Sequence, residues 1–388
     1  MEQYDVVIIG GGGTGAATAY DLALRGFTVA LFERGELTSG TTGRHHGQLH
    51  SGARYALGDT RIAQECMAET RILRRIAGDC LEYNQGLFLA LDDPGEALTE
   101  DFVDACRAAD IPATEIPPRR ALELEGRINP HTRRAVLVPD GTIDAYRLAM
   151  RFFASAAARG AVIRNFTEVT SVETQGGRVT TVGIHSLRNR RDSTIKTQAV
   201  VNAGGPWADR VAALAGLDVP VTPAAGTMVA VEGRLTNMVI SRLRRPSDGD
   251  IVVPQRKLSI VGSTQRRVPS PDALHPLEEE IRFLLGAADE LVPGFSQQPF
   301  RAAWTAARPL AGRSDDDGRS ISRDIAIVDH GKKDGVRGFF SVTGGKATTL
   351  RIMGEMAADA VAQYLGSDET SQTALFELYP YAHFWRVQ

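Results

Sequence analysis

The N-terminal segment Tyr4–Glu33 constrains the fold most strongly, because a glycine-rich loop separates a short apolar run from a helical segment. Val6–Ile9 is apolar and β-branched, which is typical of a strand buried on both faces of a parallel sheet. Gly10, Gly12 and Gly15 follow with the spacing G-x-G-x-x-G. The first glycine permits a tight turn, the second lets a pyrophosphate approach, and the third lets the helix pack closely. This order predicts a β-α-β unit that binds a dinucleotide.

An acidic residue supports the same interpretation. Thr14–Arg25 has helical composition, Thr28–Phe32 is a second apolar run, and Glu33 ends that run. A carboxylate at this position can accept hydrogen bonds from the ribose hydroxyls of an adenosine. The alternative is a purely structural glycine turn, but the order of strand, helix and acid favours a dinucleotide. The position of the motif at the N-terminus favours FAD over NAD.

Composition excludes several classes of protein. The chain has 388 residues, which suits two domains, and a formal net charge of -3, which disfavours nucleic-acid binding. Its three cysteines, Cys66, Cys80 and Cys106, show no C-x-x-C spacing, so we expect no disulfide framework and no metal site. The sequence contains no run of about 18 apolar residues, so we expect no membrane-spanning helix. The cytoplasm is the expected location.

The remaining pattern changes along the chain. Residues 37–55 are rich in glycine and polar residues and predict an extended loop. From Val221 to about Arg308 short strands alternate with turns, which is typical of an antiparallel sheet carrying a helix. The predicted helices are Thr60–Ile76, Glu96–Ala109, a helix capped by Asp144 that runs to Ala158, Pro276–Leu291 and Lys346–Leu365. Ser367–Gln388 has no regular pattern and is predicted to be a tail.

Three sets of segments resemble a known family. Residues 38–55, T-S-G-T-T-G-R-H-H-G-Q-L-H-S-G-A-R-Y, are similar to the flavin-contacting loop of FAD-dependent glycerol-3-phosphate dehydrogenases. Residues 200–208, V-V-N-A-G-G-P-W-A, resemble the second FAD-contact turn of the wider D-amino-acid-oxidase-like superfamily. Residues 307–310, 322–324 and 343–351 resemble substrate-side and flavin-side segments of the same dehydrogenases. The resemblance is greatest to the large subunit of the anaerobic bacterial enzyme, without the cysteine-rich C-terminal extension of that subunit.

The resemblance implies an α/β fold in two domains. A glutathione-reductase-type FAD-binding Rossmann domain, with an inserted antiparallel β-sheet substrate domain, is the expected architecture. The expected FAD-binding domain comprises residues 1–85, 136–220 and 322–366, and the substrate-binding domain comprises residues 86–135 and 221–321. Residues 367–388 form the expected tail.

The family reaction implies specific residues. It removes a hydride from C2 of sn-glycerol 3-phosphate, passes it to flavin N5 and yields dihydroxyacetone phosphate. The phosphate needs cations, for which we expect Arg54, Arg308 and Arg323, with Tyr55 and Lys346 nearby. The alternative for each arginine is an ordinary surface or salt-bridge role. His50 is the expected base for the C2 hydroxyl, unless it only orients its loop, and Arg308 and Lys346 complete the expected catalytic set.

The resemblance also implies how FAD is held, without a covalent bond. A helix that starts near Lys346 is expected to direct its N-terminus at the pyrimidine edge of the flavin. The expected cofactor-binding residues are Gly10, Gly12, Thr14, Gly15, Glu33, Arg34, Thr41, Thr42, Arg44, His45, Gly47, Leu49, Ala203, Gly204, Trp207, Gly344, Gly345, Lys346, Ala347 and Thr348.

Two other functions stay open. Pro223-Ala-Ala-Gly226 has alanine where relatives often place lysine before the glycine, so another polyol phosphate, a 2-hydroxy acid or an amino acid is an alternative substrate. A non-catalytic FAD-binding subunit is the other alternative. The expected electron acceptor is a quinone or an electron-transfer subunit. Homo- or hetero-oligomers and peripheral contact with the inner face of the cell membrane are further expectations.

Overall fold

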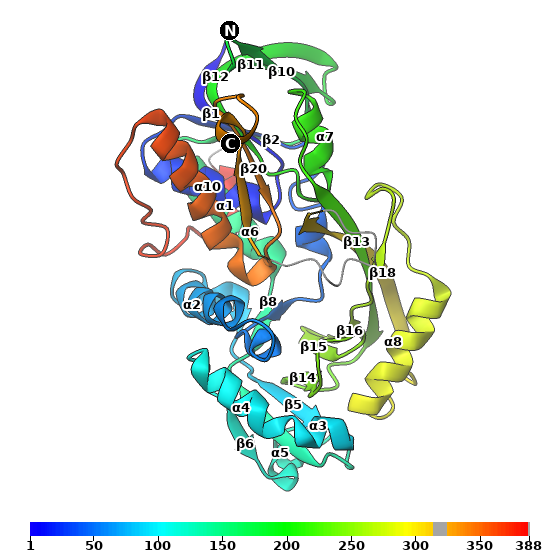
Figure 1. Cartoon of the computed structure of the whole chain (residues 1–388). Helices are drawn as coiled ribbons and strands as arrows, with labels where there is room; N and C mark the ends of the chain where they lie inside the picture. Colours follow the sequence, from blue (N-terminus) through cyan, green and yellow to red (C-terminus); the bar gives the residue numbers. More distant parts are fainter. Residues whose placement is uncertain (313–323, 387–388) are drawn as a thin grey trace.

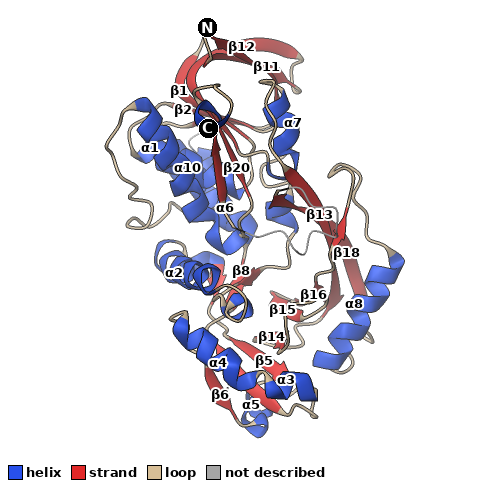
Figure 2. Ribbon diagram, in the orientation of Figure 1, coloured by secondary structure: helices blue, strands red, loops and turns tan. Residues whose placement is uncertain are grey.

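The computed structural model describes residues 1–312 and 324–386. Two large β-sheets form its two halves, with a small sheet between them (Figures 1 and 2). No helix within these described ranges is long and apolar enough to cross a membrane.

The first sheet contains the N-terminal β-α-β unit. Its order in the described chain is β10-β11-β12-β1-β2-β9, with β20 pairing β12 and β19 pairing β20. β1 lies parallel to both β2 and β12, as a doubly wound sheet requires. The strands are β1 (Gln3–Ile9), β2 (Val29–Phe32), β9 (Val162–Arg164), β10 (Thr167–Gln175), β11 (Arg178–Ser186), β12 (Arg191–Asn202), β19 (Ala326–Asp329) and β20 (Phe339–Thr343).

Helices pack on this first sheet. α1 (Gly13–Leu24) contacts α6 (Ala145–Ala158) and α10 (Leu350–Leu365), and the three share one apolar core with β1 and β2. Close approach of α1 to α10 depends on Gly354, because a Cβ there would lie 2.6 Å from the backbone carbon of Ala17. α7 (Ala208–Ala213) and the short α9 (His330–Lys333) also contact this sheet.

The second sheet is antiparallel apart from one pair. Its order in the described chain is β17-β13-β16-β15-β14-β5-β7-β6, with β18 on β13, and β14 lies parallel to β5. The strands are β5 (Gly86–Ala90), β6 (Thr114–Ile116), β7 (Arg134–Val138), β13 (Val221–Glu232), β14 (Val239–Arg242), β15 (Ile251–Gln255), β16 (Leu258–Gly262), β17 (Arg266–Arg267) and β18 (Phe300–Ala311). The expected inserted antiparallel sheet is therefore present, with one parallel exception. We propose that the two sheets mark the two domains.

The second sheet has its own helices. α8 (Glu278–Leu291) packs on β13 and β16, where Leu284, Ala288 and Leu291 are buried. α3 (Asp93–Ala97), α4 (Thr99–Ala108) and α5 (Pro118–Leu124) lie near β5, β6 and β7 (Figure 1). The predicted single helix Glu96–Ala109 is two helices. Asp92 caps an earlier start at α3, and the helix is interrupted at Leu98.

The predicted loop 37–55 is not wholly extended. It contains 3₁₀ turns at Thr41–Arg44 and Ala53–Tyr55 and the strand β3 (Gln48–Leu49). β3 and β4 (Leu81–Glu82) flank β8 (Gly141–Ile143) in the small sheet. α2 (Thr60–Ile76) follows this loop and has the bounds that its apolar spacing predicts.

The C-terminal segment 367–386 differs from the predicted tail. Leu378 and Phe384 are buried, and the 3₁₀ helix Tyr381–Arg386 packs on α6. The buried Arg151 of α6 donates hydrogen bonds to the carbonyl oxygens of Leu378 and Tyr379. This segment is held by a small number of buried apolar side chains and by hydrogen bonds to its backbone carbonyl groups. Such contacts leave no periodic pattern in the sequence, so the segment could not be predicted from periodicity.

Candidate active site

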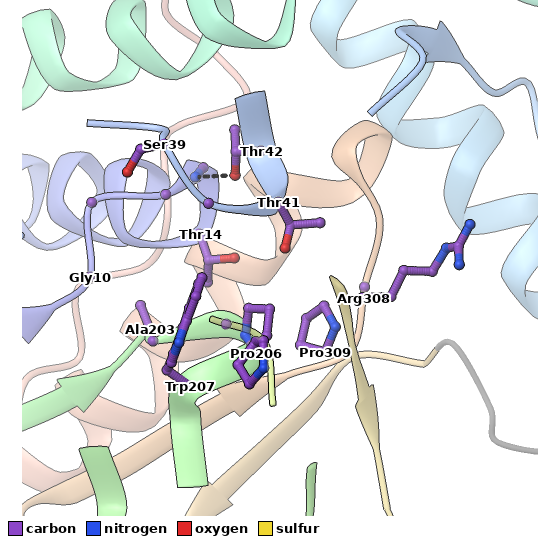
Figure 3. A pocket seen from close by; sticks show the side chains of 18 of the residues that line it. Gly10, Thr14, Ser39, Thr41, Thr42, Ala203, Pro206, Trp207, Arg308 and Pro309 are labelled. Atoms are coloured by element: carbon purple, nitrogen blue, oxygen red, sulfur yellow. Dashed lines mark hydrogen bonds between the residues drawn. The ribbon is translucent and has the colours of Figure 1, made fainter. Parts of the chain in front are cut away.

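A cavity of about 760 Å³ opens where the carboxyl ends of the first-sheet strands meet β18 of the second sheet. Its size is in the range of pockets that hold small molecules and cofactors. Figure 3 shows Gly10, Thr14 and Thr42 on one side of it and Arg308 on the other. In an open α/β sheet this edge is the expected place for a ligand.

Backbone geometry fixes the glycine loop. Gly10 has φ +115°, and a Cβ there would lie 2.5 Å from the carbonyl oxygen of Ala203. A Cβ at Gly15 would lie 2.0 Å from the carbonyl oxygen of Gly10. Gly10 and Gly12 line the cavity, whereas Gly15 does not, so the third glycine serves the packing of α1.

Two polar side chains hold this loop in place. The carboxylate of Glu33 accepts hydrogen bonds from the backbone N–H groups of Gly11 and Gly35, each at 2.7 Å. Thr42 Oγ1 accepts from the N–H of Gly13 at 3.0 Å, as the dashed line in Figure 3 marks. Each carboxylate oxygen keeps a lone pair for a further donor, such as a ribose hydroxyl.

The tautomer of His45 can be assigned from its hydrogen bond. Its Nδ1 accepts from the N–H of Gly47 at 2.9 Å, and burial lowers the pKa of His45 to about 4. The neutral ring therefore carries its proton on Nε2. That Nε2–H group is buried, and no side chain or backbone group in the described chain accepts its hydrogen bond.

A second buried polar atom complements the first. Gln48 donates from Nε2 to Asp140 at 2.8 Å, and its Oε1 is buried without a donor among the described residues. Asp140 also accepts from both the N–H and the hydroxyl of Ser51. His45 and Gln48 line the cavity and offer one donor and one acceptor. A flavin ring presents both, so the residues of this cavity fit FAD.

His50, Tyr55 and Lys346 form one cluster at the cavity. The rings of His50 and Tyr55 have centroids 5.6 Å apart, and Lys346 Nζ lies 4.9 Å from the centroid of Tyr55. The N–H of His50 donates to Thr348 Oγ1 at 3.1 Å, which ties the loop to the segment before α10. This segment is a 3₁₀ turn, Ala347–Thr349, so the helix that was predicted from Lys346 begins its α-helical part at Leu350.

Arg308 reaches the cavity from β18. Its Nη2 donates to the hydroxyl of Ser263 and, at 3.2 Å, to the carbonyl oxygen of Thr264. A Cβ at Gly226 would lie 2.5 Å from the same nitrogen, so that glycine leaves room for the guanidinium. The guanidinium is held on the second sheet and faces a cavity that belongs mainly to the first.

Most of the predicted site residues line this cavity. They are Gly10, Gly12, Thr14, Glu33, Arg34, Thr41, Thr42, Arg44, His45, His50, Tyr55, Ala203, Gly204, Trp207, Arg308, Gly344, Gly345, Lys346, Ala347 and Thr348. No group of side chains that could hold a metal ion occurs in the described part of the chain.

Other predicted residues are not part of the cavity lining. Arg54 donates instead to the carbonyl oxygen of Ser247 and to the buried Asp250, at 2.9 and 3.0 Å. Leu49 is buried in the core, and Gly47 packs against Gln255. Arg323 lies outside the described residues.

Sequence reasoning missed several cavity residues. Val169 lies in β10, which carries no motif, Leu214 directly follows α7, and Asp272 lies in a loop of the second sheet. Gly11 and Gly13 lie inside the glycine motif at positions that the consensus leaves free. Gln48 and Pro206 were also missed, although they lie inside the motif segments 38–55 and 200–208, so these residues and the two glycines had a local signal that could have been used.

Comparison with known proteins places this site in a family. Residues 5–360 match the FAD-dependent oxidoreductase family. The chain is 40% identical over 376 residues to an anaerobic glycerol-3-phosphate dehydrogenase subunit of Escherichia coli K12, covering 96% of this chain and 69% of that protein. The corresponding subunit of Haemophilus influenzae is 39% identical, covering 95% and 66%.

Solved structures share the fold. Glycine oxidase from Geobacillus kaustophilus has a TM-score of 0.78 and 24% identity, covering 97% of this chain and 99% of the other. Glycerol-3-phosphate dehydrogenase from Bacillus halodurans complexed with FAD has a TM-score of 0.74 and 23% identity, covering 97% and 68%.

The chain is therefore an FAD-dependent oxidoreductase, with FAD as its cofactor. Within that class it belongs to the FAD-dependent glycerol-3-phosphate dehydrogenase family.

Proposed function

We propose that the chain oxidises sn-glycerol 3-phosphate to dihydroxyacetone phosphate. The observation that carries this proposal is the 40% identity, over 96% of the chain, to an enzyme subunit that is named for this activity. The cationic groups of Arg308 and Lys346 at the same cavity support it, because a phosphate dianion needs such partners.

The proposed phosphate site joins both sheets. Arg308 offers a planar fork of donors from β18, and Lys346 offers a point charge from the turn before α10. Tyr55 lies against Lys346 and limits the positions that its ammonium group can take. Arg323 remains a proposed third cation. Arg54 would have to leave Asp250 before it could contribute.

His50 is the proposed base. When bound, FAD supplies the hydride acceptor at flavin N5. The imidazole of His50 then takes the proton of the C2 hydroxyl as the C2 hydride leaves. The bond from His50 N–H to Thr348 and the bond from Thr70 Oγ1 to the His50 carbonyl, at 2.9 Å, fix the backbone that carries this ring.

FAD is proposed to lie along the predicted cofactor residues. The glycine loop and Glu33 would hold the pyrophosphate and ribose, and His45 and Gln48 would supply a donor and an acceptor for the flavin ring. Residues 344–348 line the cavity just before α10, so the positive end of this helix favours negative charge there.

Electrons are proposed to leave to a partner subunit or to a quinone. The relative in Escherichia coli is named as one subunit of its enzyme, which supports a partner subunit. A homo- or hetero-oligomer, a cytoplasmic location and peripheral contact with the membrane are part of the same proposal.

A substrate panel tests the proposal. The FAD-loaded protein is mixed without oxygen with sn-glycerol 3-phosphate, a second polyol phosphate, a 2-hydroxy acid and an amino acid. We expect only sn-glycerol 3-phosphate to bleach the flavin fully. Ala224 and Ala225 supply no cation beside Arg308, which leaves room for a substrate other than sn-glycerol 3-phosphate. Preferential bleaching by an acid or an amino acid would favour an enzyme that acts on that class of substrate. No bleaching by any compound would favour a non-catalytic FAD-binding subunit.

A further inference from the structure

A loop of the second sheet forms part of the wall of the FAD cavity. Residues 268–277 connect β17 to α8, and Pro271 and Asp272 of this loop line the cavity. Their neighbours in that wall, Trp207 and Arg210, belong to the chain that follows β12 of the first sheet. The loop therefore crosses from one sheet to the other over the cofactor cavity.

The side chain of Asp272 makes the crossing. Trp207 Nε1 donates to its Oδ1 at 2.6 Å, Arg210 donates to its Oδ2, and Arg34 Nη2 lies 3.5 Å from Oδ1. These three partners all come from the first-sheet half of the molecule. Hydrogen bonds from Arg210 and Trp207 lower the pKa of Asp272 to about 2, so the carboxylate is charged at neutral pH.

A second side chain of the loop, Ser270, holds Asp272 in position for this contact. Ser270 Oγ accepts from the N–H of Asp272 at 3.2 Å, and Arg210 Nη2 donates to the same hydroxyl at 3.0 Å. Arg210 therefore bridges two side chains of the loop.

The contact lies at the end of the cavity that carries Glu33. Arg34 follows Glu33, the residue proposed to hold the ribose, and its guanidinium lies 4.7 Å above the ring of Trp207. Val169 and Leu214, which line the same cavity, give this end an apolar wall suited to a purine ring.

We propose that Asp272 is a positioning residue for FAD, which clamps loop 268–277 over the adenosine end of the cofactor by binding Trp207 and Arg210. FAD would then leave only after these bonds between the two sheets have broken. The clamp does not depend on the identity of the substrate, because it acts at the end of FAD that is remote from the flavin ring.

The test measures FAD release. The FAD-loaded protein is diluted, and the rise in fluorescence of free FAD gives the dissociation rate. We expect D272N to release FAD roughly fivefold faster than the wild type at low salt, because it loses charge-assisted hydrogen bonds. W207F removes only the indole N–H donor and should also accelerate release. D272E keeps the charge and should restore part of the slow release.

A matched control separates the clamp from a general loss of surface charge. Asp192 pairs with His185 at 2.7 Å on the exposed β11–β12 hairpin, away from the cavity, so D192N should release FAD at the wild-type rate. High salt should reduce the difference between wild type and D272N, because exposed ion pairs are screened. Wild-type release rates in both D272N and W207F would overturn the proposal, as would equal acceleration by D192N.

Discussion

Arg308 extends from β18 of the second sheet to the cavity, where it is proposed to bind the substrate phosphate. Replacing it with alanine should raise KM for sn-glycerol 3-phosphate by about 10- to 100-fold, because a charge-assisted hydrogen bond to the phosphate is lost. The visible spectrum of bound FAD should change little. Arg308→Lys keeps the charge but loses the planar pair of donors, so its KM should lie between those of the wild type and Arg308→Ala. An unchanged KM in Arg308→Ala would remove this residue from the phosphate site.

His45 gives the site a pH dependence of stability. Its ordinary pKa is 6.5, and burial lowers this pKa to about 4 in the folded protein because it disfavours the charged ring. Between these values the unfolded chain binds more protons, so stability falls as the pH falls from 6.5 to 4. The loss is at most about 3 kcal/mol.

His45→Asn removes this titration and keeps an acceptor for the N–H of Gly47. Urea unfolding of the two FAD-loaded proteins across this pH range measures the difference. The wild-type stability should fall more steeply than that of the variant. Parallel curves would show that His45 is not buried in its neutral form.

The two arginines Arg54 and Arg308 show what sequence can predict at this scale. Both match family motifs, yet Arg308 lines the cavity and Arg54 pairs with Asp250, far away in sequence. A motif identifies the residue type at a position. It does not reveal which distant carboxylate packs beside it, because that depends on the tertiary fold.

At the scale of elements, a buried arginine of α6 joins this helix to the C-terminal segment. Arg151 donates to two carbonyl oxygens of that segment and pairs with Asp79. Arg151→Met should destabilise the protein by about 2 kcal/mol, because the carbonyl of Leu378 loses a buried hydrogen bond and that of Tyr379 a partly buried one. Hydrogen exchange should also rise in residues 378–386.

A neighbouring residue on α6 provides the control. Arg147 lies one turn before Arg151 and contacts the ring of Tyr381 at 5.2 Å and the carboxylate of Asp144. Arg147→Met should change stability by less than about 1 kcal/mol. Equal exchange in residues 378–386 of both variants would contradict the role given to Arg151.

Local signals predicted some elements well and others poorly. α2 has a regular apolar stripe, and α6 has the cap Asp144, so their bounds followed from sequence. The cap of α2 at Asp59 was found only in the structure. The break between α3 and α4 and the docking of segment 367–386 had no periodic signal. The early start of α3 follows the local cap Asp92, which apolar periodicity does not reveal. The docking of segment 367–386 depends on contacts with α6, which local sequence does not encode.

At the scale of the whole molecule, the cavity exists because the second sheet meets the first. The glycine loop, Glu33 and His45 lie within the first 45 residues, whereas Arg308 and Asp272 come from the second half of the chain. The dinucleotide motif predicted the glycine loop and Glu33 from physical reasoning alone, whereas His45 was predicted through the resemblance of residues 38–55. Arg308 was predicted only through the resemblance, and Asp272 had no signal at all.

The central claim is that a hydride from C2 of sn-glycerol 3-phosphate reduces FAD in this cavity. Rapid anaerobic mixing with substrate that carries either hydrogen or deuterium at C2 tests it most directly. The account predicts that the flavin absorbance bleaches in both cases and that the deuterated substrate bleaches it several-fold more slowly. Bleaching at equal rates, in a step shown to be limited by chemistry, or no bleaching with either substrate, would contradict it.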